Sequence, residues 1–167
     1  IGRGIGPALE VRDVYKVLEN APDAPEDLRE KALGFAASIL EWDPEVSRGR
    51  GRDLAAKILQ TGQALKSLES IIDAQGRKSD PDRPGDLVHA VTASRSGTIS
   101  KIDSHRISGI ARRAGAPMDK SAGIDLAIPL GEEVKAGDTL SFIHANVEAD
   151  FRIAADAAEN ESGIEID

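Results

Sequence analysis

Three glycines at the start of the chain have a spacing that could bind phosphate. Gly2, Gly4 and Gly6 precede an apolar pattern typical of a helix, and the free N–H groups and dipole of a helix N-terminus attract anions. No Lys-Ser or Lys-Thr pair follows these glycines, as it would in a phosphate-binding loop. A tight turn in which glycine adopts positive φ explains the same spacing. We therefore favour the turn and keep phosphate binding as the alternative.

A second group of polar residues is an alternating run of arginine and glycine. Arg48, Arg50 and Arg52 precede the third helical segment and lie close to the acidic residues Glu45 and Asp53. They could hold a phosphorylated ligand or RNA. In an acidic chain, however, a solvated loop is the simpler interpretation of three such arginines.

The histidines and paired carboxylates do not form a recognisable catalytic pattern. His89, His105 and His144 lack the spacing of a zinc-binding helix, in which two histidines lie four residues apart. His144 ends an alternating apolar run and is best explained as a hydrogen-bonded polar group at the end of a strand. Carboxylate pairs occur in turn-rich segments, where no apolar surroundings would raise a pKa for acid catalysis. These pairs are Asp80 with Asp82 and Glu132 with Glu133.

Composition excludes several classes of site. The 167 residues include no cysteine, which excludes a disulfide framework, a zinc-thiolate site and a thiol nucleophile. A net charge of −8 argues against a broad nucleic-acid surface, because such binding neutralises phosphates with clustered basic residues. No apolar run approaches the roughly 20 residues that cross a bilayer. We expect a cytoplasmic protein that binds neither nucleic acid nor a membrane.

The elements that must position these residues fall into two halves. Helical spacing predicts four helices between Pro7 and Gln75, the second of which begins at a capping box formed by Asp23 and Glu26. We expect the second helix to bury a row of apolar residues. These are Leu28, Ala32, Phe35, Ala36, Ile39 and Leu40.

Residues 76–86 combine turn-forming and charged residues, which indicates a linker. Beyond it the apolar pattern alternates, which predicts a β-rich module. We expect Ser104 to cap a short helix in this module, and a further helix near the end of the chain. The predicted strands span residues 87–92, 97–102, 124–128, 140–144 and 164–166, and the predicted helices span residues 106–114 and 151–160.

The run from Glu133 to Ile143 is similar to half of the motif found in biotinyl and lipoyl carrier domains, where a strand pair bends through a glycine turn. Those carriers need a lysine at the tip of the next hairpin. Residues 144–147 contain no lysine. We therefore exclude carrier function and expect only the hairpin.

Several sequence segments, taken in order, resemble the C-terminal third of proteins in the pyrimidine nucleoside phosphorylase family. They are IGRGIGPALEVRD at residues 1–13, DAQG at 73–76, GTISKID at 97–103, RAGAPMDKSAGID at 113–125 and GDTLSFIHA at 137–145. The opening phrase is most similar to the archaeal AMP phosphorylase branch, whose members are often labelled thymidine phosphorylase. The resemblance spans nearly the whole chain.

The resemblance implies an α+β fold in two parts. Residues 1–84 would be the helical C-terminal part of the family's central α/β domain, and residues 85–167 an α/β-hammerhead-like C-terminal domain. Without the sheet of the central domain, we expect the helices to leave apolar faces partly uncovered. The hammerhead domain is associated in the archaeal branch with assembly, so we expect a homo-oligomer.

The resemblance also implies the chemistry. Phosphate would attack the anomeric carbon of a nucleoside or nucleoside monophosphate such as thymidine or AMP. The products would be the free base and a (deoxy)ribose 1-phosphate or ribose 1,5-bisphosphate. The family's catalytic groups align upstream of Ile1, so we expect no catalytic residue here, no required cofactor, and an inactive chain. A free-standing, non-catalytic binding or assembly module remains the alternative.

Some members of the family hold a potassium ion. Carried over by position, its ligands would be the backbone carbonyls of Ile1 and Gly4 and the carboxylate of Asp13. A hard cation prefers oxygen ligands such as these. Relatives commonly have glutamate at the position of Asp13. The aspartate side chain is one methylene shorter, so its carboxylate reaches less far. The alternative is that Asp13 is simply an exposed residue of the first helix.

Overall fold

Two compact units make up the chain in a computed structural model that describes residues 1–167. The first unit contains residues 1–2 and 12–81, and the second contains residues 3–11 and 82–167. Residues 3–11, which the sequence analysis grouped with the helices, thus pack with the second unit. Helices and antiparallel sheets occur together, which confirms the predicted α+β class. The chain has no helix with the length and apolar character needed to cross a membrane.

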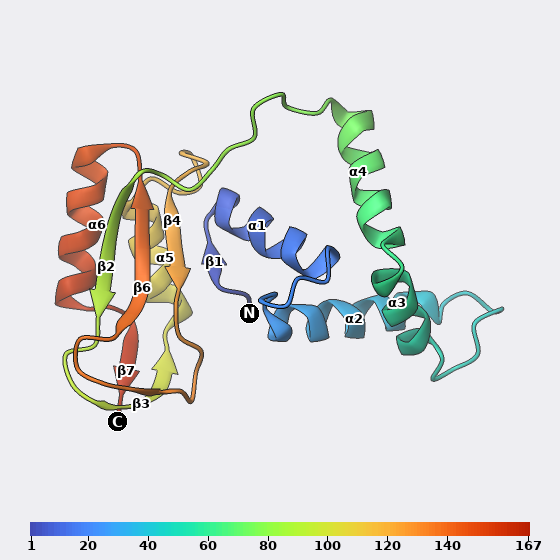
Figure 1. The fold of residues 1–167 in the computed structure, drawn as a ribbon, viewed down its shortest axis with the longest axis horizontal. Helices are drawn as coiled ribbons and strands as arrows, with labels where there is room; N and C mark the ends of the chain where they lie inside the picture. Colours follow the sequence, from blue (N-terminus) through green and yellow to red (C-terminus); the bar gives the residue numbers. More distant parts are fainter. The chain divides into compact units, whose positions relative to one another are not determined.

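The four helices predicted before residue 76 are present (Figure 1). They are α1 (Pro7–Leu18), α2 (Glu26–Leu40), α3 (Gly51–Gln60) and α4 (Gln63–Gln75). α3 packs along α2. The two backbones approach closely at Gly51, where an added Cβ would lie 2.3 Å from the carbonyl oxygen of Ala37. Residues 76–86 contain no helix or strand, as expected of the predicted linker.

α2 buries none of its residues. Phe35 and Ile39 are 62% and 57% exposed, and Trp42, just beyond the helix, is 79% exposed. The prediction that the apolar row of this helix is buried is therefore wrong, because α3 covers only part of it. The uncovered apolar faces expected of these helices are present.

The start of α2 differs from the predicted capping box. Pro25 is the residue before the helix, and no side chain caps it. Asp23 instead accepts a hydrogen bond from Lys16 Nζ over 2.6 Å. The capping prediction failed because Asp23 lies two residues before the N-cap position, beyond reach of the first helical N–H groups.

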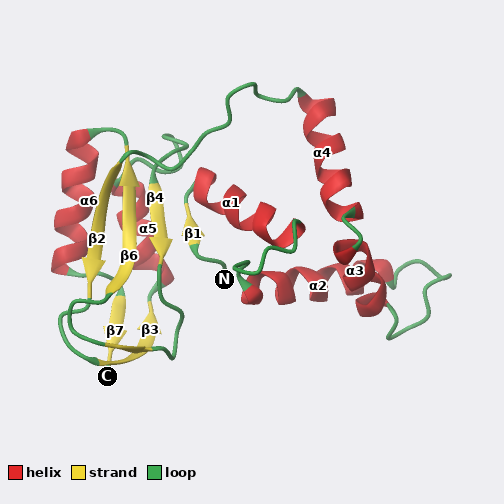
Figure 2. Ribbon diagram, viewed as in Figure 1, coloured by secondary structure: helices red, strands yellow, loops and turns green.

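The second unit is built on a four-stranded antiparallel sheet in the order β1-β4-β6-β2 (Figure 2). Its strands are β1 (Gly4–Ile5), β4 (Gly123–Leu126), β6 (Thr139–Ala145) and β2 (Leu87–Thr92). Helices α5 (Ser104–Arg113) and α6 (Glu148–Asn160) pack on this sheet and on each other. Their apolar residues form one core with Ile124 and Ile143.

α5 begins one residue earlier than a cap at Ser104 would allow. The carboxylate of Asp103 accepts hydrogen bonds from the backbone N–H groups of His105, over 3.0 Å, and Arg106, over 3.1 Å. Ser104 is the first helical residue, so the prediction that it caps the helix is wrong. Asp103 is the N-cap because its carboxylate reaches two free N–H groups of the first turn.

A second, three-stranded sheet has the order β5-β3-β7. It consists of β5 (Glu133–Val134), β3 (Gly97–Ile102) and β7 (Ile164–Ile166). β5 pairs with β3 and not with β6, so the hairpin expected between residues 133 and 143 is wrong. The intervening turn is held elsewhere, because Gly137 N–H donates to the Ala93 carbonyl and Ala93 N–H donates to the Asp138 carbonyl, each over 2.8 Å.

Candidate functional site

The glycine-rich opening forms a turn, a short strand and the start of a helix. Gly2 and Gly6 have φ values of +74° and +130°, which confirms the turn for these two positions. Gly4 lies in β1, where a Cβ would stand 2.6 Å from the backbone of Leu9. Gly4 is therefore required for close approach and not for positive φ.

The N-terminus of α1 already has its own hydrogen-bond acceptors. Gly6 N–H donates to Glu10 Oε1 over 3.0 Å, and Ala8 N–H donates to the carbonyl of Lys120 over 3.0 Å. Pro7, between them, has no N–H. The carboxylate of Glu10 thus occupies the place where a phosphate would sit. This geometry favours the structural interpretation of the glycines over a phosphate cradle.

The residues implied for a potassium site have different surroundings. Ile1 is 70% exposed, Gly4 is in β1, and Asp13 is only 2% exposed within α1. The interpretation of Asp13 as an exposed helix residue is therefore wrong. Its Oδ1 accepts from Arg12 Nη2 over 2.9 Å, so a guanidinium already balances the carboxylate charge. The potassium ion stays a prediction from the resemblance, and no step below depends on it.

The arginine-glycine run is an exposed loop that leads into α3, whose first residues are Gly51 and Arg52. Glu41 Oε1 accepts from Gly49 N–H over 2.9 Å and from Gly51 N–H over 3.0 Å, which fixes the backbone. Arg50 Nε lies 3.7 Å from Asp53 Oδ2, and Arg52 is ion-paired with Glu30. Arg48, Arg50 and Arg52 are exposed. This arrangement agrees with a solvated loop.

The histidines do not come together with a nucleophile. His144 Nδ1 lies 3.2 Å from the carbonyl oxygen of Gly85, which confirms a hydrogen-bonded group at a strand end. His89 contacts the ring of Phe151 edge-on, and its Nε2 lies 3.7 Å from Glu159 Oε1. The paired carboxylates of residues 80, 82, 132 and 133 are exposed, as expected.

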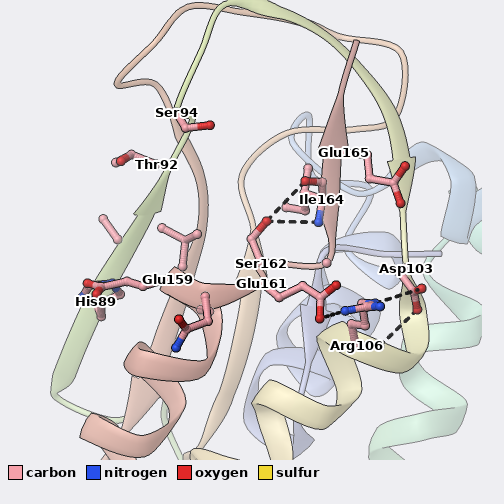
Figure 3. A pocket seen from close by; sticks show the side chains of 15 residues that line it. His89, Thr92, Ser94, Asp103, Arg106, Glu159, Glu161, Ser162, Ile164 and Glu165 are labelled. Carbon is pink, nitrogen blue, oxygen red and sulfur yellow. Dashed lines mark hydrogen bonds and ion pairs between the residues drawn. The ribbon is translucent and has the colours of Figure 1, made fainter.

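A hollow of the second unit lies between β2 and the segment that joins α6 to β7 (Figure 3). Its volume is about 460 Å³. Thr92 and Ser94 lie on one side, Ser162 and Ile164 on the other, and Arg106 at the start of α5. Ser162 Oγ donates to the Ile164 carbonyl over 3.3 Å and accepts from the Ile164 N–H over 3.2 Å. The second wall is therefore a fixed turn.

Negative charge dominates this pocket. Arg106 is paired with Glu161, and its Nε also lies 3.6 Å from Asp103 Oδ2. The backbone N–H of Arg106, followed by that of His105, lowers the pKa of Asp103 below its usual value, so this carboxylate stays charged. Four carboxylates line the pocket, and Arg106 is its one arginine. The four are Asp103, Glu159, Glu161 and Glu165.

This charge distribution limits what the pocket can do. An anionic phosphate would be repelled by the carboxylates, and no hydroxyl in the pocket has a neighbouring base within hydrogen-bond reach to activate it as a nucleophile. The structure contains no group of three or more His, Cys, Asp or Glu residues that could hold a metal ion. This pocket was not predicted from the sequence, although the three glutamates between residues 159 and 165 were a visible signal.

Comparison with known proteins finds a match to one family model and matches to several longer curated proteins. Residues 98–165, within the second unit, match the family model of the pyrimidine nucleoside phosphorylase C-terminal domain. Over 158 residues the chain is 56% identical to a bifunctional ribose 1,5-bisphosphokinase-thymidine phosphorylase of Azorhizobium caulinodans, a match that covers 95% of this chain and 23% of that protein.

Two putative thymidine phosphorylases match along the same length. The one from Methylococcus capsulatus is 48% identical over 166 residues, which is 99% of this chain and 32% of that protein. The one from Bradyrhizobium diazoefficiens is 44% identical over 167 residues, which is 100% of this chain and 33% of that protein. The chain thus spans about a quarter to a third of the length of the curated relatives it matches.

Proposed function

We propose that this chain is a C-terminal part of a nucleoside phosphorylase of the pyrimidine nucleoside phosphorylase family, the family that these matches support, and that it supplies scaffold and not reacting groups. The observation that carries the second part is the charge of the pocket beside β2. Four carboxylates and one paired arginine line it. Such a lining is opposite in sign to a phosphate cradle.

In the proposed reaction, an oxygen of inorganic phosphate forms a bond to the anomeric carbon as the bond from that carbon to the base nitrogen breaks. The base leaves with the electron pair and is protonated. This chemistry needs cationic or N–H groups on the phosphate, a donor to the departing base, and a cleft that excludes water. We assign these groups to the part of the relatives that this chain does not cover.

A feature of the relatives' names supports a nucleoside 5′-monophosphate such as AMP as one substrate. Two relatives are named bifunctional ribose 1,5-bisphosphokinase-thymidine phosphorylases. Phosphorolysis of a nucleoside keeps only the new phosphate and gives a ribose 1-phosphate. Phosphorolysis of a 5′-monophosphate keeps both phosphates and gives ribose 1,5-bisphosphate, the compound on which the kinase part of such a protein is named to act.

The remaining parts of the proposal concern assembly and surroundings. Phosphate and the nucleoside or nucleotide are the proposed ligands of the longer enzyme, in a cytoplasmic homo-oligomer without a required cofactor. The exposed apolar residues Phe35, Ile39 and Trp42 support further association, because a monomer seldom leaves such a group uncovered.

The test uses the longer protein that carries this chain. It is incubated with phosphate and either AMP or thymidine, and the sugar products are identified by mass spectrometry. Release of adenine with ribose 1,5-bisphosphate supports the AMP proposal, and release of thymine with deoxyribose 1-phosphate supports the thymidine alternative. Absence of phosphate-dependent base release from either would overturn the enzyme assignment in favour of a non-catalytic assembly module.

A further inference from the structure

Two sheet edges border the pocket described above. β2 is the last strand of the four-stranded sheet, and β7 is the last strand of the three-stranded sheet. Figure 3 shows these strands on opposite sides of the pocket. In an antiparallel edge strand, every second residue turns its N–H and C=O away from the neighbouring strand. β2 therefore presents unpaired backbone groups along one side.

The edge of β2 that carries the unpaired backbone groups faces the pocket. The consecutive residues His89, Ala90, Val91 and Thr92 all line it. Successive strand residues point to opposite faces of a sheet, so a wall made of consecutive residues is the edge of the strand and not one of its faces. The backbone of β2 is accordingly accessible from this hollow.

A second hollow extends the first one along the chain. Its volume is about 360 Å³, and it shares part of its lining with the first, including Thr92, Ser94 and Ile164. It continues past Arg95 to Asp167. The two hollows together form a groove between β2 and β7, which we call the edge groove. Its length along two strands suits an extended chain.

The charge of the edge groove selects what kind of chain can enter. Five carboxylates and two arginines line it, and one of these arginines, Arg106, is already paired with Glu161 and Asp103. Glu165 is paired with Lys101 over 2.6 Å, so Glu159 and Asp167 are the carboxylates left without an arginine or lysine partner. The five carboxylates are Asp103, Glu159, Glu161, Glu165 and Asp167. The groove thus complements a segment that carries lysine or arginine side chains.

We propose that the edge groove binds an extended, basic segment of a partner protein, which adds a strand to the free edge of β2. Main-chain hydrogen bonds to β2 hold the segment, as in other cases of strand addition. Its basic side chains meet the carboxylates of the acidic wall, among them Glu159 and Asp167. This inference does not depend on the proposed phosphorolysis.

Pairing of β2 with the same strand of a second copy is the competing use of this edge. It would bring two grooves of the same negative sign together, which costs energy through charge repulsion. The groove contains no basic group free to offset that repulsion except Arg95. The charge therefore favours a basic partner over a second copy.

The test is titration of the 167-residue chain into a fluorescein-labelled peptide in which lysine alternates with valine or threonine, followed by fluorescence anisotropy. We expect saturable binding that weakens about tenfold between low and high salt, because exposed charges are screened. A version of the peptide with N-methylated backbone nitrogens keeps the charge but loses the strand hydrogen bonds. It should bind about tenfold more weakly, given the typical net worth of one or two such bonds.

A matched pair of variants tests the acidic wall. Glu159→Gln combined with Asp167→Asn should weaken peptide binding about fivefold, as expected for two exposed ion pairs. Glu132→Gln combined with Glu133→Gln removes the same charge from exposed positions outside the groove and should have no effect. The N-methylated peptide needs no variant, so the test survives if a substitution unfolds the chain.

Three results would overturn the proposal. One is the absence of saturable binding. Another is equal binding of the N-methylated and unmodified peptides, which would indicate charge attraction alone. The third is a peptide-resistant dimer in sedimentation experiments that is lost on substitution within β2, which would assign the edge to a second copy.

Discussion

Gly123 in β4 lies directly against the backbone of Ile5 in β1: a Cβ on Gly123 would stand 2.2 Å from the Ile5 carbonyl oxygen. The neighbouring pair Ile5 and Ile124 is in register in the antiparallel ladder. Because the obstacle is backbone and not a flexible side chain, only glycine fits. This contact holds β1 against β4 within the second unit.

Gly123→Ala should therefore destabilise the protein by about 1–3 kcal/mol, the usual cost of forcing an atom into a packed site. The measurement is the free energy of unfolding from urea titration. Gly34→Ala is the control, because Gly34 lies within α2 and a Cβ there meets nothing within 4 Å. That substitution should gain about 0.5–1 kcal/mol from helix propensity. Equal effects of the two substitutions would contradict the close approach.

Glu10→Ala should cost about 1 kcal/mol, since it removes the acceptor for the Gly6 N–H and a negative charge at the start of α1. Glu10→Gln, which keeps an acceptor oxygen, should cost less. Urea titration again gives the free energies. A variant as stable as the original protein would show that the Glu10 carboxylate does not cap the helix.

Inorganic phosphate should leave the melting temperature of the chain unchanged apart from its general salt effect, for which sulfate is the control. A ligand that binds only the folded state must raise stability. A saturable rise specific to phosphate would mean that the glycine-rich opening, or another part of the chain, forms a phosphate site after all.

Tyr15 offers a spectroscopic prediction, because it is the only tyrosine. Its hydroxyl donates to Glu69 Oε1 over 2.6 Å, and this bond to a carboxylate raises the pKa of Tyr15 above its usual value of 10. Phenolate absorbance should titrate at a higher pH in the native protein than in the unfolded chain. Glu69→Ala should return the pKa of Tyr15 towards its usual value. An unchanged titration curve would show that the bond does not form in solution.

The sign of the linked effect on stability is fixed by the direction of that shift. A group with a raised folded-state pKa stabilises the protein fully below its unfolded value, and this stability is lost as pH rises through the folded value. The protein should therefore become less stable above about pH 10. Tyr15→Phe should lack that step in a plot of unfolding free energy against pH.

The lowered pKa of Asp103 predicts a change in the stability of the protein at acid pH. Hydrogen bonds from the N–H groups of Arg106 and His105 lower the pKa of its carboxyl. The stability that Asp103 contributes is therefore present above its unfolded-state pKa of about 3.9. It is lost as pH falls through the lower folded-state pKa. Asp103→Asn still accepts hydrogen bonds but does not titrate, so its stability should fall less steeply under acid. Identical acid profiles would contradict the cap.

Helix and strand positions could be predicted because apolar periodicity and glycine stops are local signals. Gly76 ends α4, and Gly115, with φ of +118°, follows α5. Helix caps were harder to predict, since Asp103 and Ser104 are both good capping residues and are adjacent in sequence. Only the position of the first helical turn decides between them.

Long-range pairing could not be predicted from local patterns. The apolar pattern around Val134 and Leu140 predicts a hairpin. In the structure, however, the turn between them is hydrogen-bonded to Ala93, and the two segments belong to different sheets. Asp13 was wrongly predicted to be exposed: it is 2% exposed, and its carboxylate is paired with the neighbouring Arg12. The acidic pocket likewise joins segments more than 50 residues apart, from His89 to Glu165.

The central claim is that these 167 residues support a phosphorylase without carrying its reacting groups. The most direct test measures release of adenine from AMP, or of thymine from thymidine, by the purified chain in the presence of phosphate, beside the longer protein under the same conditions. We predict no phosphate-dependent release from the chain and rapid release from the longer protein. Turnover by the chain alone at the rate of the longer protein would contradict the account.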